Sequence, residues 1–263
     1  MISAVVLTKN EEENIEKCLR TLRFCNEIVV IDDNSNDHTR DIAKKLGAEI
    51  YKRDMDMDYA AQSNYGMEKA KNKWVLFVDA DERISNELAD EITEAVGYEG
   101  VSGFLLRRID YMWGKWLTHG EVGSNRFMRL VRKRSGKWVR RVHPRFEIRG
   151  KTLNLKNPIL HYPHPSVKEF IAKVDKWSTW HALANSEEGK KATISKVVLM
   201  PIGHFIRNFI LNLGFLDGIR GLIFAFVMSF HSYLAWSKLL LLQRVGAVSF
   251  RQRRIQNEAE TEF

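Results

Sequence analysis

The sequence predicts an α/β fold built on a doubly wound, mostly parallel sheet. Two short runs, residues 2–8 and 27–32, are apolar and rich in β-branched residues, which is typical of strands covered on both faces. Between them, residues 11–22 carry Ile15, Leu19 and Leu22 at the spacing of one helical face. Strands that alternate with helices in this way indicate a sheet flanked by helices.

The same alternation continues to about residue 96. Further strands are expected at residues 48–52, 74–78 and 103–108, and further helices at residues 41–46, 60–70 and 86–96. An arginine-rich stretch, residues 126–149, is expected to form additional strands and loops. Sheets of this kind bind ligands beyond the carboxyl ends of their strands, so the residues that follow each strand are the first to consider.

The composition favours a folded body with a surface that attracts polyanions. Hydrophobic residues make up 44% and charged residues 28% of the chain, which excludes wholesale disorder and a polytopic membrane protein. The net charge of +8 suits anionic lipid, nucleic acid or a phosphorylated saccharide. An apolar strand follows Met1 without a basic leader, and we therefore expect a cytoplasmic location. Cys18 and Cys25 have no histidine partners, and both are expected to be reduced, buried thiols.

Polar residues gather at the ends of the first two predicted strands. Thr8, Asn10 and Glu11 follow the first strand, and Asp32 and Asp33 end the second. A helix cap or a turn is the alternative interpretation for single residues of this kind. Two adjacent carboxylates at the mouth of a sheet repel each other, however, and a base or ribose that donates hydrogen bonds would offset that cost. The pair therefore indicates a ligand site.

The fourth predicted strand stops at an acidic tripeptide, Asp79-Ala80-Asp81. Mg²⁺ or Mn²⁺ is typically held by one or two protein carboxylates, while phosphate oxygens and water complete the octahedron. An acidic cap on the next helix is the alternative. Because the tripeptide ends the fourth strand of a series whose first two strands also end in polar residues, we interpret it as a metal site.

Four segments of the first 96 residues carry a family resemblance. They are TKNEEENI, VVIDDNSNDHT, the helix-borne Gln62-Ser63-Asn64, and LFVDADE. Together they resemble the family 2 glycosyltransferases with the GT-A fold, which implies an inverting, metal-dependent transfer of sugar from a nucleotide diphosphate donor. By matching position, the resemblance implies a nucleotide-sugar site formed by Thr8, Asn10, Glu11, Asp32, Asp33, Asn64, Asp79, Ala80 and Asp81. It further implies that Mg²⁺ or Mn²⁺ binds Asp81, with Asp79 beside it.

The later chain is similar to a narrower subgroup, the lipopolysaccharide-core β-glucosyltransferases and relatives that act on lipid-linked glycans. The segments that carry this likeness are YMWGKWLTHG, RFMRLVRK, Val142-His143 and GFLDGIRGLIFA. The likeness implies transfer of a hexose, with glucose favoured, from a UDP-sugar to lipopolysaccharide core or another lipid-linked saccharide. Transfer to a polyprenyl-linked or capsule glycan is an alternative, and so is a non-catalytic, membrane-bound scaffold with the same fold.

An inverting transfer needs a carboxylate on the acceptor side to take the hydroxyl proton. Members of this family commonly carry an acid shortly before the Arg-Leu of the RLVRK-like run, where this chain has Asn125. Glu121 is the closest acid upstream and is our candidate for the catalytic base, with Glu147 and His143 as alternatives.

Several arginines come after this position in the sequence. Their guanidinium groups are suited to bind the phosphates of an anionic ligand, and a solvated basic surface is the alternative. The anionic-ligand candidates are Arg126, Arg129 and Arg132.

The carboxyl-terminal part is expected to be helical and to associate with membranes. A helix is predicted at residues 167–185, and residues 194–242 are strongly apolar. Polar residues such as Arg207 and Asp217 interrupt the stretches long enough to cross a bilayer. We therefore expect an amphipathic helical segment lying in the interface of an anionic membrane. A helical hairpin packed on the core or in a dimer interface is the alternative.

These expectations divide the chain into two parts. Residues 1–165 form a GT-A catalytic domain, with a donor half of about 1–96 and an acceptor half of about 97–165, and residues 166–263 form the membrane-associating region. The expected location is peripheral, on the cytoplasmic side of the inner membrane. Expected partners are the UDP-sugar, the lipid-linked acceptor and the anionic membrane surface, and a homo-oligomer is left open. No nucleic-acid partner is expected, because no recognition helix or stacking strand is apparent.

Overall fold

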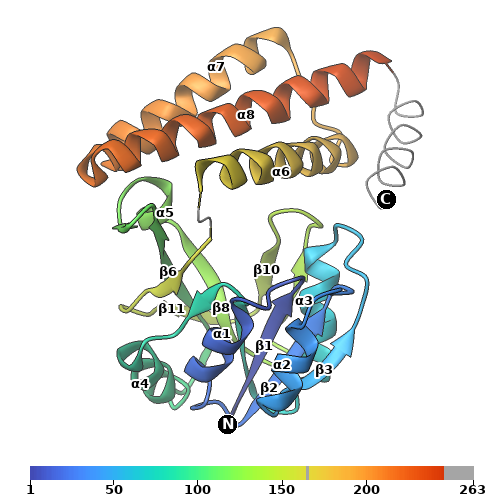
Figure 1. The fold of residues 1–263 in the computed structure, drawn as a ribbon, viewed down its shortest axis with the longest axis vertical. Coiled ribbons are helices and arrows are strands. Elements are labelled where there is room, and N and C mark those ends of the chain that lie inside the picture. Colours follow the sequence, from blue (N-terminus) through green and yellow to red (C-terminus); the bar gives the residue numbers. More distant parts are fainter. Residues whose placement is uncertain (164–165, 246–263) are drawn as a thin grey trace. The chain divides into compact units, whose positions relative to one another are not determined.

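A computed structural model describes residues 1–163 and 166–245 of the chain (Figure 1). The chain divides into two compact units, the first being Met1–Pro165 and the second beginning at Ser166. Unit 1 mixes strands and helices, and the described part of unit 2 is helical. The predicted α/β class is confirmed.

The first part of unit 1 alternates strands and helices in the predicted order. The strands are β1 (Ile2–Thr8), β2 (Glu27–Asp32), β3 (Glu49–Lys52) and β4 (Trp74–Asp79). The helices are α1 (Ile15–Thr21), α2 (Thr39–Lys45), α3 (Tyr59–Lys69) and α4 (Asn86–Ala95). Helix α1 begins four residues later than predicted, because the backbone N–H groups of Glu11 and Glu12 bond to side chains of Thr39 and Asp37.

The second part of unit 1 is mostly strands. They are β5 (Glu82–Arg83), β6 (Val101–Met112), β7 (Lys115–Leu117), β8 (Arg126–Arg132), β9 (Gly136–Val139), β10 (Arg145–Ile148), β11 (Lys151–Asn154) and β12 (Ile159–His161). A short helix, α5 (Gly120–Ser124), joins β7 to β8. Strand β6 is twice as long as predicted, because its second half pairs with β7 and β12.

The main sheet is parallel in one half and mixed in the other. Its strand order is β3-β2-β1-β4-β8-β6-β12-β5. The first four strands are mutually parallel, whereas β8 runs antiparallel to both β4 and β6. Thr8 lies opposite Asp32, and Leu7 lies opposite Asp79. The carboxyl ends of β2, β1 and β4 therefore meet at one edge of the sheet.

Alternate residues of the central strands fill two cores, one on each face of the sheet. Val6 and Leu76 pack in the core that includes residues of α1, α2 and α4, and Val5 and Phe77 pack in the core that includes residues of α3 and of the β9–β10 hairpin. This is the period-two pattern of a strand buried on both faces. Gly66 of α3 is required there, since a Cβ at this position would lie 2.4 Å from Val5 Cγ1.

The two cysteines are free thiols in different environments. Cys18 of α1 is buried, as predicted, whereas Cys25, in the turn before β2, is only partly buried. Burial raises the pKa of Cys25 to about 12 and raises the pKa of Cys18 further.

Residues 166–245 of unit 2 form three long helical segments. Helix α6 is Val167–Glu187, and α7 (Ile194–Phe205) continues into the π-helical turn η1 (Ile206–Leu211). A 3₁₀ turn, η2 (Gly214–Asp217), leads into α8 (Ile219–Val245). Lys238 of α8 ties this helix to α6, because its Nζ donates to Asp175 Oδ1 at 2.7 Å and to Ser178 Oγ at 2.8 Å.

Within the described residues, two segments are long and apolar enough to cross a membrane, judged by length and composition alone. They are Ile194–Leu211 and Ile219–Arg244. The expectation of an amphipathic segment lying in the membrane interface stays a prediction.

Candidate functional site

The loops that follow β1 and β2 are joined by hydrogen bonds into one structure, the rim, made of residues 9–12 and 33–39. The backbone N–H of Asn10 donates to Ser35 Oγ at 2.9 Å, and that of Glu11 donates to Thr39 Oγ1 at 2.7 Å. In the other direction, the N–H of Asn36 donates to Asn10 Oδ1 at 2.9 Å. Asn10 has a φ of 53°, a left-handed conformation that asparagine adopts more readily than most residues.

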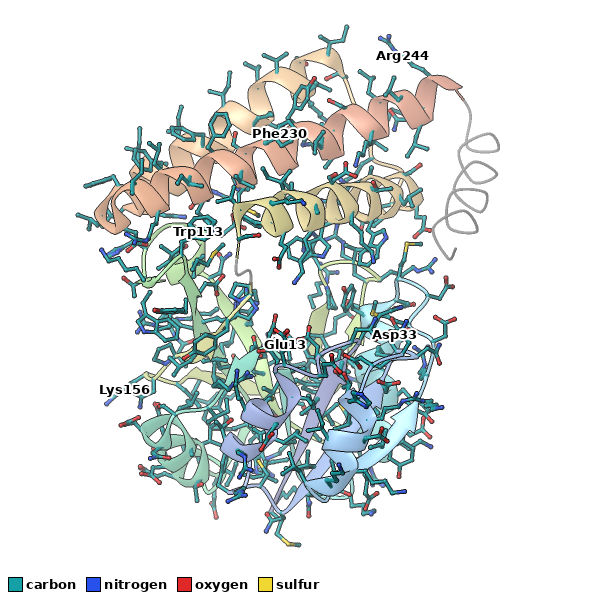
Figure 2. All side chains as sticks on the ribbon, viewed as in Figure 1. Glu13, Asp33, Trp113, Lys156, Phe230 and Arg244 are labelled. Atoms are coloured by element: carbon teal, nitrogen blue, oxygen red, sulfur yellow. The ribbon has the colours of Figure 1, made fainter. Side chains whose placement is uncertain are left out.

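The two carboxylates at the end of β2 have different environments. Asp32 is fully buried, and its Oδ2 accepts a hydrogen bond from the N–H of Ser35 at 3.0 Å. Asp33 Oδ1 accepts from the N–H of Met55 at 3.0 Å, and its Oδ2 pairs with the exposed Nζ of Lys9 at 3.1 Å. Asp32 therefore holds the loop, whereas Asp33 lies at the edge of unit 1 where β1 and β2 end (Figure 2).

The carboxylates of Asp33, Asp79 and Asp81 lie within electrostatic reach of Tyr59, the first residue of α3. Burial raises the pKa of the Tyr59 hydroxyl, and the negative charges of Asp79, Asp33 and Asp81 raise it further. Carboxylates from β2, from β4 and from the turn after β4 therefore lie within electrostatic reach of one phenol group. Such a concentration of negative charge at a sheet edge suits a bound cation.

Asp79 is held in place by a buried ion pair behind it. Arg129 Nη2, from β8, lies 2.9 Å from Asp79 Oδ2 and 2.7 Å from Glu82 Oε1. Glu82 is fully buried, and its Oε2 accepts from the N–H of Asp79 at 2.9 Å. Burial raises the pKa of Glu82, and the charge of Arg129 opposes that rise. Glu82 and Arg129 together fix the backbone and the side chain of Asp79.

Asp81 faces a histidine at the end of β12. His161 Nε2 lies 3.2 Å from Asp81 Oδ2, and His161 Nδ1 lies 2.9 Å from Asp110 Oδ1. Burial and Arg108 disfavour the charged imidazole, but the two carboxylates outweigh them and raise the pKa of His161 to about 9. The pKa of Asp110 is lowered, because Arg108 and His161 outweigh the effect of burial.

His161 and Asp110 were not predicted from the sequence. Both residues lie outside the segments that carry the family resemblance, and Asp110 lies inside a strand. The available signal was the position of His161 at the end of a short apolar run, Ile159–His161, where a strand end meets the ligand edge of a sheet.

A divalent ion at this edge of the sheet would be held by two protein side chains. Among residues 1–163 and 166–245, no three His, Cys, Asp or Glu side chains are arranged to hold a metal by themselves. Asp81 and His161 nevertheless present an oxygen and a nitrogen to each other, and a diphosphate would supply the further oxygens that such ions take. Asp79 is the poorer of the two predicted ligands, because Arg129 already binds its Oδ2.

Several predicted nucleotide-site residues have structural partners. Asn64 Nδ2 donates to the carbonyl of Trp138 at 2.8 Å, and the N–H of Trp138 donates to Asn64 Oδ1 at 2.9 Å, so the amide joins α3 to β9. Thr8 is buried, and its carbonyl accepts from the N–H of Asp33 at 2.9 Å. Ala80 is buried in the turn between Asp79 and Asp81.

The three predicted arginines are spread along β8, and Arg129 is the one that contacts the acidic cluster. Arg126 Nη1 donates to the carbonyl of Leu155 at 3.1 Å. Arg132 lies opposite Trp74, at the start of β4, and donates to the carbonyl of Val101 at 2.8 Å. Because β8 is antiparallel to β4, Arg132 lies at the sheet edge opposite Asp79 and does not join the site.

The predicted base, Glu121, lies half-buried in α5. It is within electrostatic reach of His143. Burial and the charge of Arg140 lower the pKa of His143, and the charge of Glu121 opposes them. Two of the three candidates for the base therefore lie near each other.

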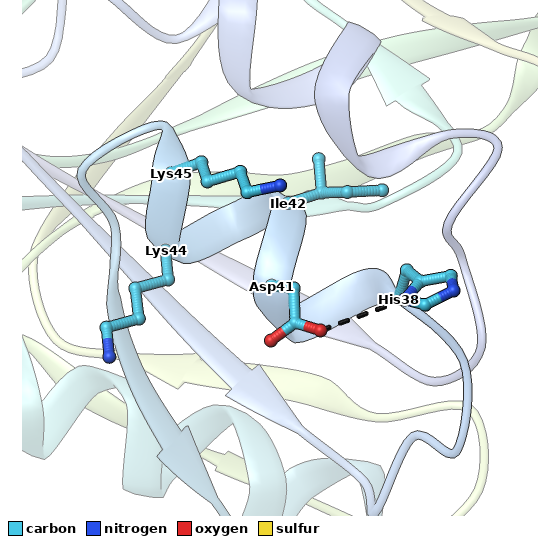
Figure 3. A pocket seen from close by; sticks show the side chains of 5 residues that line it. All are labelled: His38, Asp41, Ile42, Lys44 and Lys45. Atoms are coloured by element: carbon cyan, nitrogen blue, oxygen red, sulfur yellow. Dashed lines mark ion pairs between the residues drawn. The ribbon is translucent and has the colours of Figure 1, made fainter.

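A hollow of about 610 Å³ lies along the exposed side of α2 (Figure 3). His38 Nδ1 and Asp41 Oδ2, both exposed, lie 3.7 Å apart in its wall. The residues that line it are His38, Asp41, Ile42, Lys44 and Lys45. None of the strand-end carboxylates lines this hollow, and it is not the candidate site.

Comparison with known proteins gives a consistent result. The sequence model of the family described as "Glycosyl transferase family 2" matches residues 3–162. The lipopolysaccharide core biosynthesis glycosyltransferase LpsC of Rhizobium meliloti (strain 1021) is 28% identical over 88% of this chain and 92% of its own length. An uncharacterized glycosyltransferase of Rickettsia bellii (strain RML369-C) is 26% identical over 90% of this chain and 85% of its own.

The fold is shared with a solved structure. The crystal structure of S. aureus TarS 1-349 in complex with UDP-GlcNAc aligns with a TM-score of 0.51 and 15% identity. The alignment covers 95% of this chain and 91% of that one. At this identity the likeness concerns the fold alone.

Proposed function

The chain belongs to glycosyl transferase family 2, and from this premise we propose that it moves a hexose from a UDP-sugar to a lipid-linked saccharide at a membrane surface. The predicted family and the GT-A-type fold are confirmed by the family match and the shared fold. The observation that carries the proposal is the strand register, which brings the carboxyl ends of β1, β2 and β4, and with them Asp33, Asp79 and Asp81, to one edge of the sheet. Three carboxylates at one sheet edge suit a cation and the diphosphate bound to it.

We propose that the donor lies across the rim and the acidic turn. Asp33 and the rim residues Asn10 and Glu11 would contact the base and ribose, as the resemblance to the family implies. Asp81 and His161 would hold a divalent ion, whose chemistry is to draw charge from the departing diphosphate. Asp79, fixed by Arg129, would lie beside the ribose and the first phosphate.

On the acceptor side we propose that Glu121 takes the proton from the attacking hydroxyl, with inversion at the anomeric carbon. A positioned carboxylate of this kind typically contributes a rate factor of about 10² to 10⁴. His143 and Glu147 are the alternative bases. The proximity of His143 to Glu121 supports a polar acceptor side at this point.

The proposed acceptor and donor are supported by the names of two similar proteins. LpsC is named for lipopolysaccharide core biosynthesis, which supports a core saccharide as acceptor, and the TarS structure holds UDP-GlcNAc, which supports a UDP-linked donor. Within this proposal glucose is the favoured hexose. A polyprenyl-linked or capsule glycan is the alternative acceptor.

Unit 2 is proposed to bind the cytoplasmic face of the inner membrane. Its helices expose many large apolar side chains, far more than the scattered ones on an ordinary soluble surface. The most exposed are Leu211 at 70%, Phe226 at 68%, Ile194 at 64%, Leu199 at 63% and Ile219 at 63%. The exposed Lys190, Lys191 and Arg244 would favour anionic lipid.

Sedimentation with vesicles tests the membrane proposal. Leu211→Asp and Phe226→Asp together should release the full chain from phosphatidylglycerol vesicles, because charged groups are costly to bury in lipid. Tyr98→Asp, a matched change of an exposed residue in unit 1, should leave binding unchanged. If both variants sediment with the vesicles to the same extent, the proposal that unit 2 binds the membrane is wrong.

A donor screen by nucleotide release tests the enzymatic proposal. The wild-type protein with Mn²⁺ or Mg²⁺ should release nucleotide from a UDP-hexose, faster when deacylated lipopolysaccharide core is added. Asp81→Ala should abolish release, whereas Asp90→Ala, an exposed acid of α4, should not. A non-catalytic scaffold would release nothing from any donor, and sustained release by Asp81→Ala would refute the metal role of that residue.

A further inference from the structure

We propose that Asp110 is a positioning residue, which orients the ring of His161 so that Nε2 points at the carboxylate of Asp81. The inference rests on the proposed function, in which Asp81 and His161 hold the ion of the donor diphosphate. Neither the family match nor the relatives assign a role to Asp110.

Strand pairing places the three groups together. In the parallel pairing of β12 with β6, His161 lies beside Asp110, and in the antiparallel pairing of β12 with β5, it lies beside Glu82. The side chains of His161 and Asp110 emerge on one face of the sheet, with Nδ1 and Oδ1 2.9 Å apart. The backbone N–H of Tyr162 donates to the carbonyl of Asp81 at 2.9 Å. The ring is therefore set by a paired strand, and the acidic turn is tied to the same strand.

Asp110 is itself anchored. Arg108, two residues earlier on β6 and so on the same face, lies with its Nε 3.2 Å from Asp110 Oδ1. The same guanidinium lies 3.8 Å from Glu82 Oε1 through Nη1. Asp110 and His161 are 3% and 8% exposed. A carboxylate buried to this extent is costly unless it is paired, and Asp110 is paired with both Arg108 and His161.

This arrangement matches the way proteins usually support a metal-binding histidine. The ring nitrogen that does not face the ion donates its proton to a carboxylate, which fixes the orientation of the ring and increases its basicity. Loss of such a partner typically weakens metal binding by about 10- to 100-fold. Asp110 occupies this place behind His161, and Asp81 marks the side on which the ion would bind.

Mn²⁺ binding to the full chain in the presence of UDP tests the inference without an activity assay. The dissociation constant is measured from the electron paramagnetic resonance signal of free Mn²⁺. Asp110→Ala should raise it about 10- to 100-fold, and His161→Ala should raise it at least as much. Asp110→Asn keeps an acceptor oxygen but loses the charge, and it should raise the constant by about threefold or more.

Glu27→Ala is the matched control. Glu27 is also a nearly buried carboxylate, bonded to Ser3 Oγ and to the N–H of Lys71, but it lies at the start of β2, at the sheet edge opposite Asp32. Its removal should lower stability without changing Mn²⁺ affinity. Thermal unfolding of each variant checks that the protein folds. If Asp110→Ala does not fold, the Mn²⁺ affinity of Asp110→Asn provides the test.

The outcomes separate this inference from the proposed function. Wild-type Mn²⁺ affinity in Asp110→Ala or Asp110→Asn, together with weakened binding in Asp81→Ala and His161→Ala, would overturn the positioning role alone. Equal binding by the wild-type protein and Asp81→Ala would overturn the proposed metal site and this inference with it. A graded loss, small in Asp110→Asn and large in Asp110→Ala, is the result that we expect.

Discussion

Replacing Arg129 with methionine removes the guanidinium that pairs with a fully buried carboxylate. Arg129 Nη2 lies 2.7 Å from Glu82 Oε1, and Glu82 has no exposed side-chain surface. Methionine keeps the length and most of the apolar contacts of the side chain while it deletes the charge. The change therefore leaves Glu82 buried without its nearest cation, and unit 1 should become less stable.

The expected loss of stability depends on the partners that remain around the Glu82 carboxylate. Removing one partner of a buried ion pair costs about 3–5 kcal/mol. Glu82 keeps the N–H of Asp79 at 2.9 Å and Arg108 at 3.8 Å, which puts the expected loss at the lower end, about 3 kcal/mol. Arg20→Met is the control, because Arg20 and its partner Glu16 are about half exposed, and an exposed pair contributes less than about 1 kcal/mol.

The loss should depend on pH with a defined sign. Burial raises the pKa of Glu82 above its ordinary value of 4.5, and Arg129 holds it down. A group whose folded pKa is raised binds its proton more tightly in the folded state, so its contribution falls as the pH rises from the unfolded pKa towards the folded one. Without Arg129 the folded pKa rises further. The deficit of Arg129→Met should therefore be largest near neutral pH and should shrink as the pH falls towards 4.5.

The free energy of unfolding of unit 1 alone is measured by urea-dependent hydrogen exchange of the peptide that contains β4. Adding Glu82→Gln to Arg129→Met should recover part of the loss near neutral pH, because the buried charge is gone. A deficit for Arg129→Met no larger than that of Arg20→Met, or a deficit that grows on acidification, would show that Arg129 does not stabilise the buried charge of Glu82.

Three further predictions concern other residues. Asn64→Ala should destabilise unit 1 by about 2–3 kcal/mol, since two hydrogen bonds to β9 are lost, and the KM for the UDP-sugar should stay unchanged; a large rise in KM would restore Asn64 to the nucleotide site. Cys18 and Cys25 should resist iodoacetamide at pH 8 until urea is added, because burial raises both pKa values; rapid labelling of the native protein would contradict this. Glu121→Gln should slow transfer about 10²- to 10⁴-fold with unchanged UDP affinity, and Glu147→Gln should not; the reverse pattern would make Glu147 the base.

The edge of the sheet at which the acidic residues lie was predictable from the sequence, because its signals are local. The apolar runs of β1, β2 and β4 are short, are buried on both faces and end at polar residues. A parallel sheet then brings those ends to one edge without further information. This is why Asp33, Asp79 and Asp81 could be assigned to one cluster from the sequence.

The partners of those carboxylates were not predictable, because they depend on strand order. Asp110 and His161 are 51 residues apart and meet because β12 pairs with β6. Arg129 reaches Asp79 while Arg132 does not, since β8 enters the sheet antiparallel to β4. The sequence shows a run of arginines but not the direction of the strand that carries them.

Polar residues near the site were harder to assign than acidic ones. Asn64 has the residue type and the position of a ligand-binding amide. The oxygen and the nitrogen of its side-chain amide, however, both form hydrogen bonds with the backbone of Trp138. That backbone lies 74 residues away along the chain. A helix-borne amide suits both roles, and the sequence does not show the distant strand to which this amide bonds.

Asp81 and its neighbours are proposed to bind a divalent ion together with a diphosphate. Equilibrium binding of UDP to the full chain, with Mn²⁺ and with EDTA, tests this proposal directly in the wild-type protein and in Asp81→Ala. We predict that Mn²⁺ tightens UDP binding by about tenfold or more, equivalent to about 1.4 kcal/mol, and that Asp81→Ala loses this gain. Equal UDP affinity with Mn²⁺ and with EDTA in the wild-type protein would contradict the account.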